Sequence, residues 1–265
     1  NVYIIVYSTV MIVVVAVLLA YASLSLADRQ KANMVVEKQG SILGSMGLAQ
    51  GASKAPDKTI SIQDEYQKYI TASYVVDGSG NVVNDMDAFG LLDALKAEFA
   101  KKDAAERRLP VFEATLEDSM RLIVLPIYGK GLWGPIWGYV ALENDWNTIY
   151  GATFDHKGET PGLGAEIATP AFADQFKGKT IFRDGNFVGV SVLKGEGASA
   201  GNPNAVDAVS GGTITSRGVQ AMVLSCLEAY MSLIEKRRNG EYDAVEPRST
   251  DIPADGSDNI NEENI

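Results

Sequence analysis

Residues 121–143 read RLIVLPIYGKGLWGPIWGYVALE, and they indicate the architecture more strongly than any other stretch of the chain. The apolar runs Arg121–Ile127 and Ile136–Glu143 lie on either side of a glycine-rich segment. A third run, Val111–Leu116, precedes them. Short runs rich in β-branched and aromatic residues, bounded by turn residues, are typical of neighbouring strands. We therefore predict strands from Pro110 onward that pair in an antiparallel sheet.

Two further segments have the pattern of hairpins. Residues 74–76 and 82–83 are apolar and flank the turn sequence Asp77-Gly78-Ser79-Gly80-Asn81. Residues 181–193 form two alternating runs joined by Asp184-Gly185, a dipeptide that favours a tight hairpin turn.

Helical patterns complete the body of the chain. Residues 64–100 have helix-like spacing around Leu91, Leu92, Leu95 and Phe99. Arg217–Arg237 is predicted as one helix whose apolar face holds Val219, Val223, Cys226, Leu227, Tyr230 and Ile234. We predict an α+β fold: one domain over residues 59–239, with an antiparallel sheet flanked by helices.

An uncharged segment, Val2–Ala27, precedes this body. A membrane-spanning helix needs about 20 apolar residues, and this run is longer. A cleaved signal peptide is the alternative, because Ser25-Leu26-Ala27 resembles a cleavage site, but a signal core has only about 7–15 residues. We predict a retained single-pass anchor over residues 1–27, in contact with membrane lipid. Because the chain begins with Asn, we expect flanking residues to be missing, so charge does not give the orientation.

The remaining segments differ in composition from the body. Residues 28–58 mix charges and glycines and are predicted as a juxtamembrane helix or stalk. Residues 240–265 hold eight acidic residues against Arg248 alone and few apolar residues, so we predict a disordered acidic tail.

The composition excludes several classes of protein. The net charge of −11 argues against nucleic-acid binding, because a negative chain repels phosphate. One Cys and one His exclude an internal disulfide, a Cys-ligated metal and a multi-histidine site. Residues 197–201, GASAG, fit the hydrolase elbow, but that enzyme needs a His later in the chain and His156 comes earlier. We predict neither catalytic residues nor a metal site.

The segment DAVSGGTITS, residues 207–216, stands directly before the last predicted helix. Small and hydroxylated residues at a helix N-terminus suit a bound phosphate, because free N–H groups and the positive end of the dipole lie there. A plain helix cap with Thr215 or Ser216 as the capping residue fits the same pattern. The Lys of a P-loop is absent, so nucleotide hydrolysis is not indicated.

Two glycine-rich segments, GKGLWGPIWGY at 129–139 and HKGETPGLG at 156–164, resemble walls for a flat aromatic ligand, although ordinary turns would have the same composition. The three segments together resemble the FMN-binding domain family. DAVSGGT is similar to its attachment motif D-x-x-(S/T)-G-A-T, with Gly212 where the family usually has Ala. The two loops resemble signatures of one branch, the C subunit of the bacterial sodium-translocating NADH:quinone reductase. The resemblance runs from about Tyr128 to Arg237.

This resemblance implies a cofactor and a place in a complex. It implies FMN joined through its phosphate to Thr213, with Ser210, Gly211, Gly212 and Thr215 around the phosphate. A separate flavin transferase would make the bond, and the domain would lie on the periplasmic side of the inner membrane. The chain would then relay electrons in a six-subunit complex. No G-x-G-x-x-G lies between a strand and a helix, so we expect no site for NADH oxidation in this chain.

The flavin ring needs its own contacts, since a tether fixes only the phosphate end. The residues predicted for this wall are Glu159, Thr160, Leu163 and Gly164, with Leu132 and Trp133 as a second set. The alternative role for Glu159 is to orient the loop, and the alternative for Trp133 is a place in the core. Two alternatives remain open: the G subunit of the related ferredoxin:NAD reductase, which shares the attachment motif, and a membrane-tethered module without redox chemistry.

Overall fold

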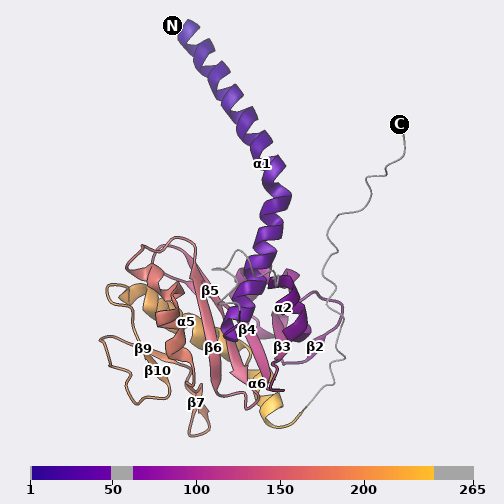
Figure 1. Ribbon diagram of the computed structural model, residues 1–265, viewed down its shortest axis with the longest axis vertical. Coiled ribbons are helices and arrows are strands. Elements are labelled where there is room, and N and C mark those ends of the chain that lie inside the picture. Colours follow the sequence, from indigo (N-terminus) through magenta and orange to yellow (C-terminus); the bar gives the residue numbers. More distant parts are fainter. Residues whose placement is uncertain (1, 49–61, 242–265) are drawn as a thin grey trace.

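The computed structural model describes residues 2–48 and 62–241. Its first element is α1, Val2–Ser45, a single helix of 44 residues. Figure 1 shows α1 leaving the domain as a lone helix over most of its length. The N-terminal part is long and apolar enough to cross a membrane, and its most apolar 18-residue window is 0% buried.

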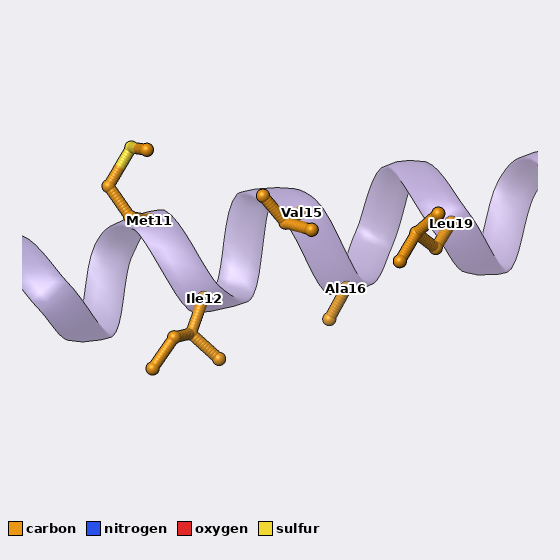
Figure 2. Close-up of a pocket in the computed structure, with 5 residues that line it drawn as sticks. All are labelled: Met11, Ile12, Val15, Ala16 and Leu19. Carbon is orange, nitrogen blue, oxygen red and sulfur yellow. The ribbon is translucent and has the colours of Figure 1, made fainter.

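The surface of this part of α1 is apolar. Figure 2 shows side chains on it that carry only carbon and sulfur: Met11, Ile12, Val15, Ala16 and Leu19. They line an open groove along the helix. Such a surface is compatible with lipid chains, and its backbone groups are satisfied within the helix, as a spanning segment requires.

A six-stranded antiparallel sheet in the order β2-β1-β3-β4-β5-β6 forms the centre of the domain. Its strands are β1 (Ile70–Asp77), β2 (Val82–Val83), β3 (Arg108–Thr115), β4 (Arg121–Lys130), β5 (Pro135–Glu143) and β6 (Ile149–His156). The α+β prediction, with its antiparallel sheet, is confirmed. Strand β6 was not predicted from the sequence; its residues IYGATFDH include Gly, Asp and His, and it lies at an edge of the sheet.

The helices cover both faces of the sheet. The end of α1 and α3 pack on one face, where they share a core with the β3 residue Phe112 and the β4 residue Leu122. On the other face α5 packs against Ile127 and Val140. The helices after α1 are α2 (Ile62–Tyr69), α3 (Leu95–Ala100), α4 (Pro170–Ala173), α5 (Thr213–Ala229) and α6 (Met231–Arg238). Short 3-10 turns lie at Gly90–Ala94, Ala104–Glu106, Gly164–Ala168 and Asp174–Phe176.

The predicted last helix is present with different bounds. It begins four residues earlier, at Thr213, and Tyr230 separates it into α5 and α6. The six residues predicted for its apolar face are all buried. One of them is Cys226, and burial raises the pKa of its thiol to about 12, so it is a core residue and not a reactive thiolate.

The predicted hairpin at residues 181–193 is shorter than expected. Asp184-Gly185 does connect two paired strands, β7 (Phe182–Arg183) and β8 (Asn186–Phe187). The second run is not one strand, because Gly189 has φ of +63° and interrupts it. The next strand, β9 (Ser191–Leu193), pairs in parallel with β10 (Ala205–Asp207) instead.

The end of α1 belongs to the core of the domain. Ile42 and Leu43 are fully buried. The Thr153 hydroxyl on β6 donates a hydrogen bond to the Ser41 carbonyl at 3.0 Å. Part of the predicted stalk thus packs against the sheet. The rest of the stalk, residues 49–58, and residues 242–265 of the predicted acidic tail lie outside the described residues.

Truncating Leu43 tests whether this helix end stabilises the domain. Leu43→Ala removes a fully buried side chain, so we expect the free energy of unfolding to fall by about 2–5 kcal/mol. Met34→Ala, on the exposed part of the same helix, should change it by about 0.5 kcal/mol or less. Urea unfolding of the full chain in detergent, followed by tryptophan fluorescence, measures both. Equal losses would contradict the packing described here.

Candidate functional site

The segment 207–216 connects β10 to the N-terminus of α5. Gly211 has φ of +73°, a conformation that favours glycine, and a Cβ there would lie 2.5 Å from Leu163 Cδ2. Gly212 occupies the N-cap position, and Thr213 is the first residue of the helix. Two glycines thus bring the loop at Leu163 against the start of the helix.

The alternative of a side-chain cap by Thr215 or Ser216 is wrong. No side chain caps α5 at Gly212, and Thr215 and Ser216 lie inside the first turns. The Ser216 hydroxyl instead accepts a hydrogen bond from the Val209 N–H at 3.0 Å. The Thr215 hydroxyl donates one to Glu159 Oε2 at 2.6 Å. Both hydroxyls therefore fasten the loops to the helix and leave its N-terminus without a side-chain cap.

Glu159 links the three segments that the sequence analysis selected. Its side chain is buried, with the residue 5% exposed. One carboxylate oxygen accepts from Thr215, and the other accepts from the Trp133 N–H at 2.8 Å. Its own N–H donates to His156 Nδ1 at 3.2 Å. A single carboxylate thus joins the 129–139 loop, the 156–164 loop and α5.

Two glycines make room for this carboxylate. A Cβ at Gly131 would lie 2.5 Å from Glu159 Oε1, and one at Gly164 would lie 2.5 Å from Glu159 Oε2. One glycine from each of the two glycine-rich segments therefore admits the Glu159 carboxylate. A Cβ at Gly218 would lie 2.5 Å from the Lys130 carbonyl oxygen. The absence of a side chain at Gly218 therefore lets α5 pack closely against the 129–139 loop.

The predicted site residues divide into a buried and an exposed group. Glu159, Gly164, Gly212 and Thr215 are buried, and Thr213 is half-buried. The exposed members are Ser210, Gly211, Thr160, Leu163, Leu132 and Trp133. The buried group has its polar contacts within the protein, and of the exposed group Leu163 lies against Gly211 and Gly212 at the start of α5. The structure thus brings the three predicted segments together at one end of α5.

Ile214 lies among the candidate site residues and was not selected from the sequence. It is 59% exposed in the first turn of α5, beside Thr213. Its signal was an apolar residue within a motif of small and hydroxylated residues. Asp207, at the start of the motif, has a structural role. Hydrogen bonds from Ser199, and from the Gly197 N–H, hold the pKa of Asp207 below its ordinary value and fix the 197–201 loop.

The arrangement suits a tethered ligand. The helix N-terminus is open, glycines allow close approach of the backbone, and exposed apolar side chains stand around it. An anion at this position would be stabilised by the helix dipole and backbone N–H groups. A ligand held by a covalent bond needs no enclosing pocket, so an open surface of this kind is sufficient.

Comparison with known proteins agrees with this geometry. Residues 131–228 match the family model described as the FMN-binding domain. The C subunit of the Na(+)-translocating NADH-quinone reductase from Vibrio alginolyticus is 32% identical over 212 residues, covering 78% of this chain and 82% of that protein. The corresponding protein from Pasteurella multocida is 35% identical over 217 residues, covering 77% and 81%. The chain belongs to this family, the C subunits of Na(+)-translocating NADH-quinone reductases.

Solved structures of family members have the same fold. The C subunit from Parabacteroides distasonis has a TM-score of 0.68 at 40% identity and covers 79% of this chain and 96% of that chain. NqrC from Shewanella oneidensis has a TM-score of 0.65 at 30% identity and covers 78% and 99%. The part matched by the FMN-binding model includes Glu159, both of its side-chain partners and the start of α5.

Removing the Glu159 carboxylate tests whether it holds the site together. Glu159→Ala leaves the buried Thr215 hydroxyl and the Trp133 N–H without their acceptor, so we expect a loss of about 1–3 kcal/mol in the free energy of unfolding. Glu159→Gln can still bond both groups and should lose less. Glu166→Ala, which removes an exposed bond to the Gly162 N–H in the same region, is the control for urea unfolding. Equal midpoints for the two alanine variants would contradict the role of Glu159.

Proposed function

We propose that this chain is an FMN-carrying electron-transfer subunit of a Na(+)-translocating NADH-quinone reductase. The observation that supports this best is the uncapped N-terminus of α5, which the Glu159 hydrogen bonds join to both glycine-rich loops, within the segment that matches the FMN-binding model. The names of the relatives support membership of the same membrane complex. When bound, FMN supplies the redox chemistry.

Thr213 is the residue we propose for covalent attachment. It is half-buried at the first position of α5, so its hydroxyl lies where the helix dipole favours a phosphate. Thr215 is 1% exposed, and its hydroxyl is engaged by Glu159. Of the two hydroxyls, that of Thr213 is therefore the more accessible. The bond would join Thr213 Oγ1 to the FMN phosphorus as a phosphodiester, and a flavin transferase would form it with FAD as donor and AMP as leaving group.

The ring of the flavin is proposed to lie against the exposed members of the site. Leu163 contacts Gly211 and offers apolar surface, and Thr160 offers a hydroxyl. Glu159 and Gly164 are buried and act by positioning this loop. In the second predicted set, Leu132 is 45% exposed and Trp133 is 70% exposed. We therefore favour Leu132 over Trp133 as a residue that contacts the flavin ring.

The setting of the subunit is proposed from the resemblance. The chain would be one of six subunits, anchored in the inner membrane by α1, with its domain on the periplasmic side where the transferase acts. It would take no part in NADH oxidation itself. The NADH-quinone reductase relatives support the sodium-pump branch over the ferredoxin:NAD reductase, and the FMN-binding match supports a flavoprotein over a non-redox module.

Covalent flavin is tested in cells that hold the transferase. The parent chain should show flavin fluorescence in a denaturing gel and the added mass of FMN minus water. Thr213→Ala should lose both, because the acceptor oxygen is gone. Thr215→Val removes the other hydroxyl and with it one partner of Glu159, so it should keep both signals at a lower yield. Flavin that persists on the Thr213→Ala chain would disprove the assignment.

The side of the membrane is tested with protease. Added to spheroplasts, it should cut the domain of the parent chain and leave a known cytoplasmic protein intact. The same cytoplasmic protein should be cut after lysis, which shows that the protease is active. A domain that stays intact until lysis would place it in the cytoplasm and refute this part of the proposal.

A further inference from the structure

The packing of α1 gives the direction from the site to the membrane. A Cβ at Gly151, early in β6, would lie 2.5 Å from the Ser45 carbonyl, whereas Thr153 bonds the Ser41 carbonyl. Strand β6 and the end of α1 therefore run in opposite directions, and the C-terminal end of β6 points toward the N-terminal, apolar end of α1. The loop after His156 lies at this end of the sheet, and so does the β4–β5 loop, because Ile136 pairs with His156.

The rise along α1 to the end of its uncharged run is about twice the rise along β6, and the β4–β5 loop continues beyond the paired residues Lys130 and Pro135. At 1.5 Å per residue, α1 rises about 21 Å from Ser41 to Ala27, where the uncharged run ends. At about 3.3 Å per residue, β6 rises about 10 Å from Thr153 to His156. The tip of the β4–β5 loop, at Leu132 and Trp133, extends further in the same direction. Figure 1 shows pink loops at the upper left, on the side of the domain from which α1 rises.

The surface at this end has a distinctive composition. Its exposed apolar side chains are Trp133 (70% exposed), Ile214 (59%), Leu132 (45%) and Leu163 (43%). The exposed charges in residues 129–135, 156–164 and 210–218 are Lys130, Lys157 and Arg217. The one acidic residue of these segments, Glu159, is buried. We call these seven exposed residues the membrane-facing rim. A basic and apolar rim on a chain of net charge −11 is a local reversal of charge.

We propose that the membrane-facing rim docks on an anionic lipid surface, with Trp133 in the interfacial layer and Lys130 and Lys157 at lipid phosphates. Tryptophan prefers this layer because its ring is apolar and its N–H is polar. Basic side chains beside it are attracted to anionic headgroups. The Glu159 bond to the Trp133 N–H fixes the backbone that presents this side chain. The proposal does not depend on covalent flavin.

The consequence of docking concerns electron transfer. The N-terminus of α5, with Thr213, lies within the rim, so docking would hold that position next to the bilayer. A cofactor there could exchange electrons with a partner inside the membrane without crossing a wide aqueous gap. The same contact would restrict rotation of the domain about α1.

The test places the full chain in nanodiscs that contain anionic phosphatidylglycerol. A variant with Trp137→Phe and Trp146→Phe keeps Trp133 as its one tryptophan. Lipids brominated near the headgroup should reduce its fluorescence more than lipids brominated near the chain ends. A matched variant that keeps Trp137 alone should be quenched less. Both the flavin-free chain and the flavin-loaded chain should show this quenching.

Charge variants show whether lipid attraction is responsible. Lys130→Glu with Lys157→Glu should reduce the quenching of Trp133. Arg121→Glu with Lys177→Glu makes the same change in charge at the opposite ends of β4 and β6 and should not reduce it. Trp133 fluorescence unaffected by brominated lipid in the isolated chain would overturn the proposal and indicate that a protein partner covers the rim. Quenching only in the flavin-free chain would show that flavin covers Trp133, and would overturn it as well.

Discussion

The site depends on the buried carboxylate of Glu159. Its two oxygens hold Thr215 and the Trp133 N–H, from segments that the chain places far apart. A buried carboxylate without partners would be costly, so the loops and the helix stabilise it only when all three are in place. The geometry at the N-terminus of α5 is therefore cooperative: loosening one loop removes a partner that the others need.

This constraint explains where glycine is required. Gly131 and Gly164 face the carboxylate so closely that a methyl group would collide with it, and Gly211 has a backbone that favours glycine. A Cβ at Gly212 would lie 3.0 Å from Val209 Cγ1 and 3.1 Å from the Leu163 carbonyl. Small shifts of a side chain could relieve part of that contact. Glycine at 212 avoids both of these tight contacts and is compatible with the same loop.

The sequence predicted the sheet where the apolar pattern was strong and missed it where the pattern was weak. β3, β4 and β5 are buried on both faces and read as nearly continuous apolar runs. β6 lies at an edge and includes polar residues, so its pairing follows from β5 and not from its own composition. The site segments were predictable because their composition is unusual. Orientation of the loop by Glu159 was one of two roles that the sequence left open, but its partner Thr215 was not predictable, because a hydrogen bond between residues 56 positions apart depends on tertiary packing.

The continuity of α1 couples this site to the apolar span. Had the predicted stalk been a flexible linker, the height of the domain above the membrane would vary, and so would the distance from Thr213 to any acceptor in the bilayer. The helix instead runs from Val2 to Ser45 and ends with Ile42 and Leu43 in the core. A helix has a fixed rise per residue, so its length sets how far the sheet lies from the end of the uncharged run. Strand β6 packs on α1, so it fixes the height of the adjoining loops along the helix. The Glu159 hydrogen bonds then fix the start of α5 relative to these loops.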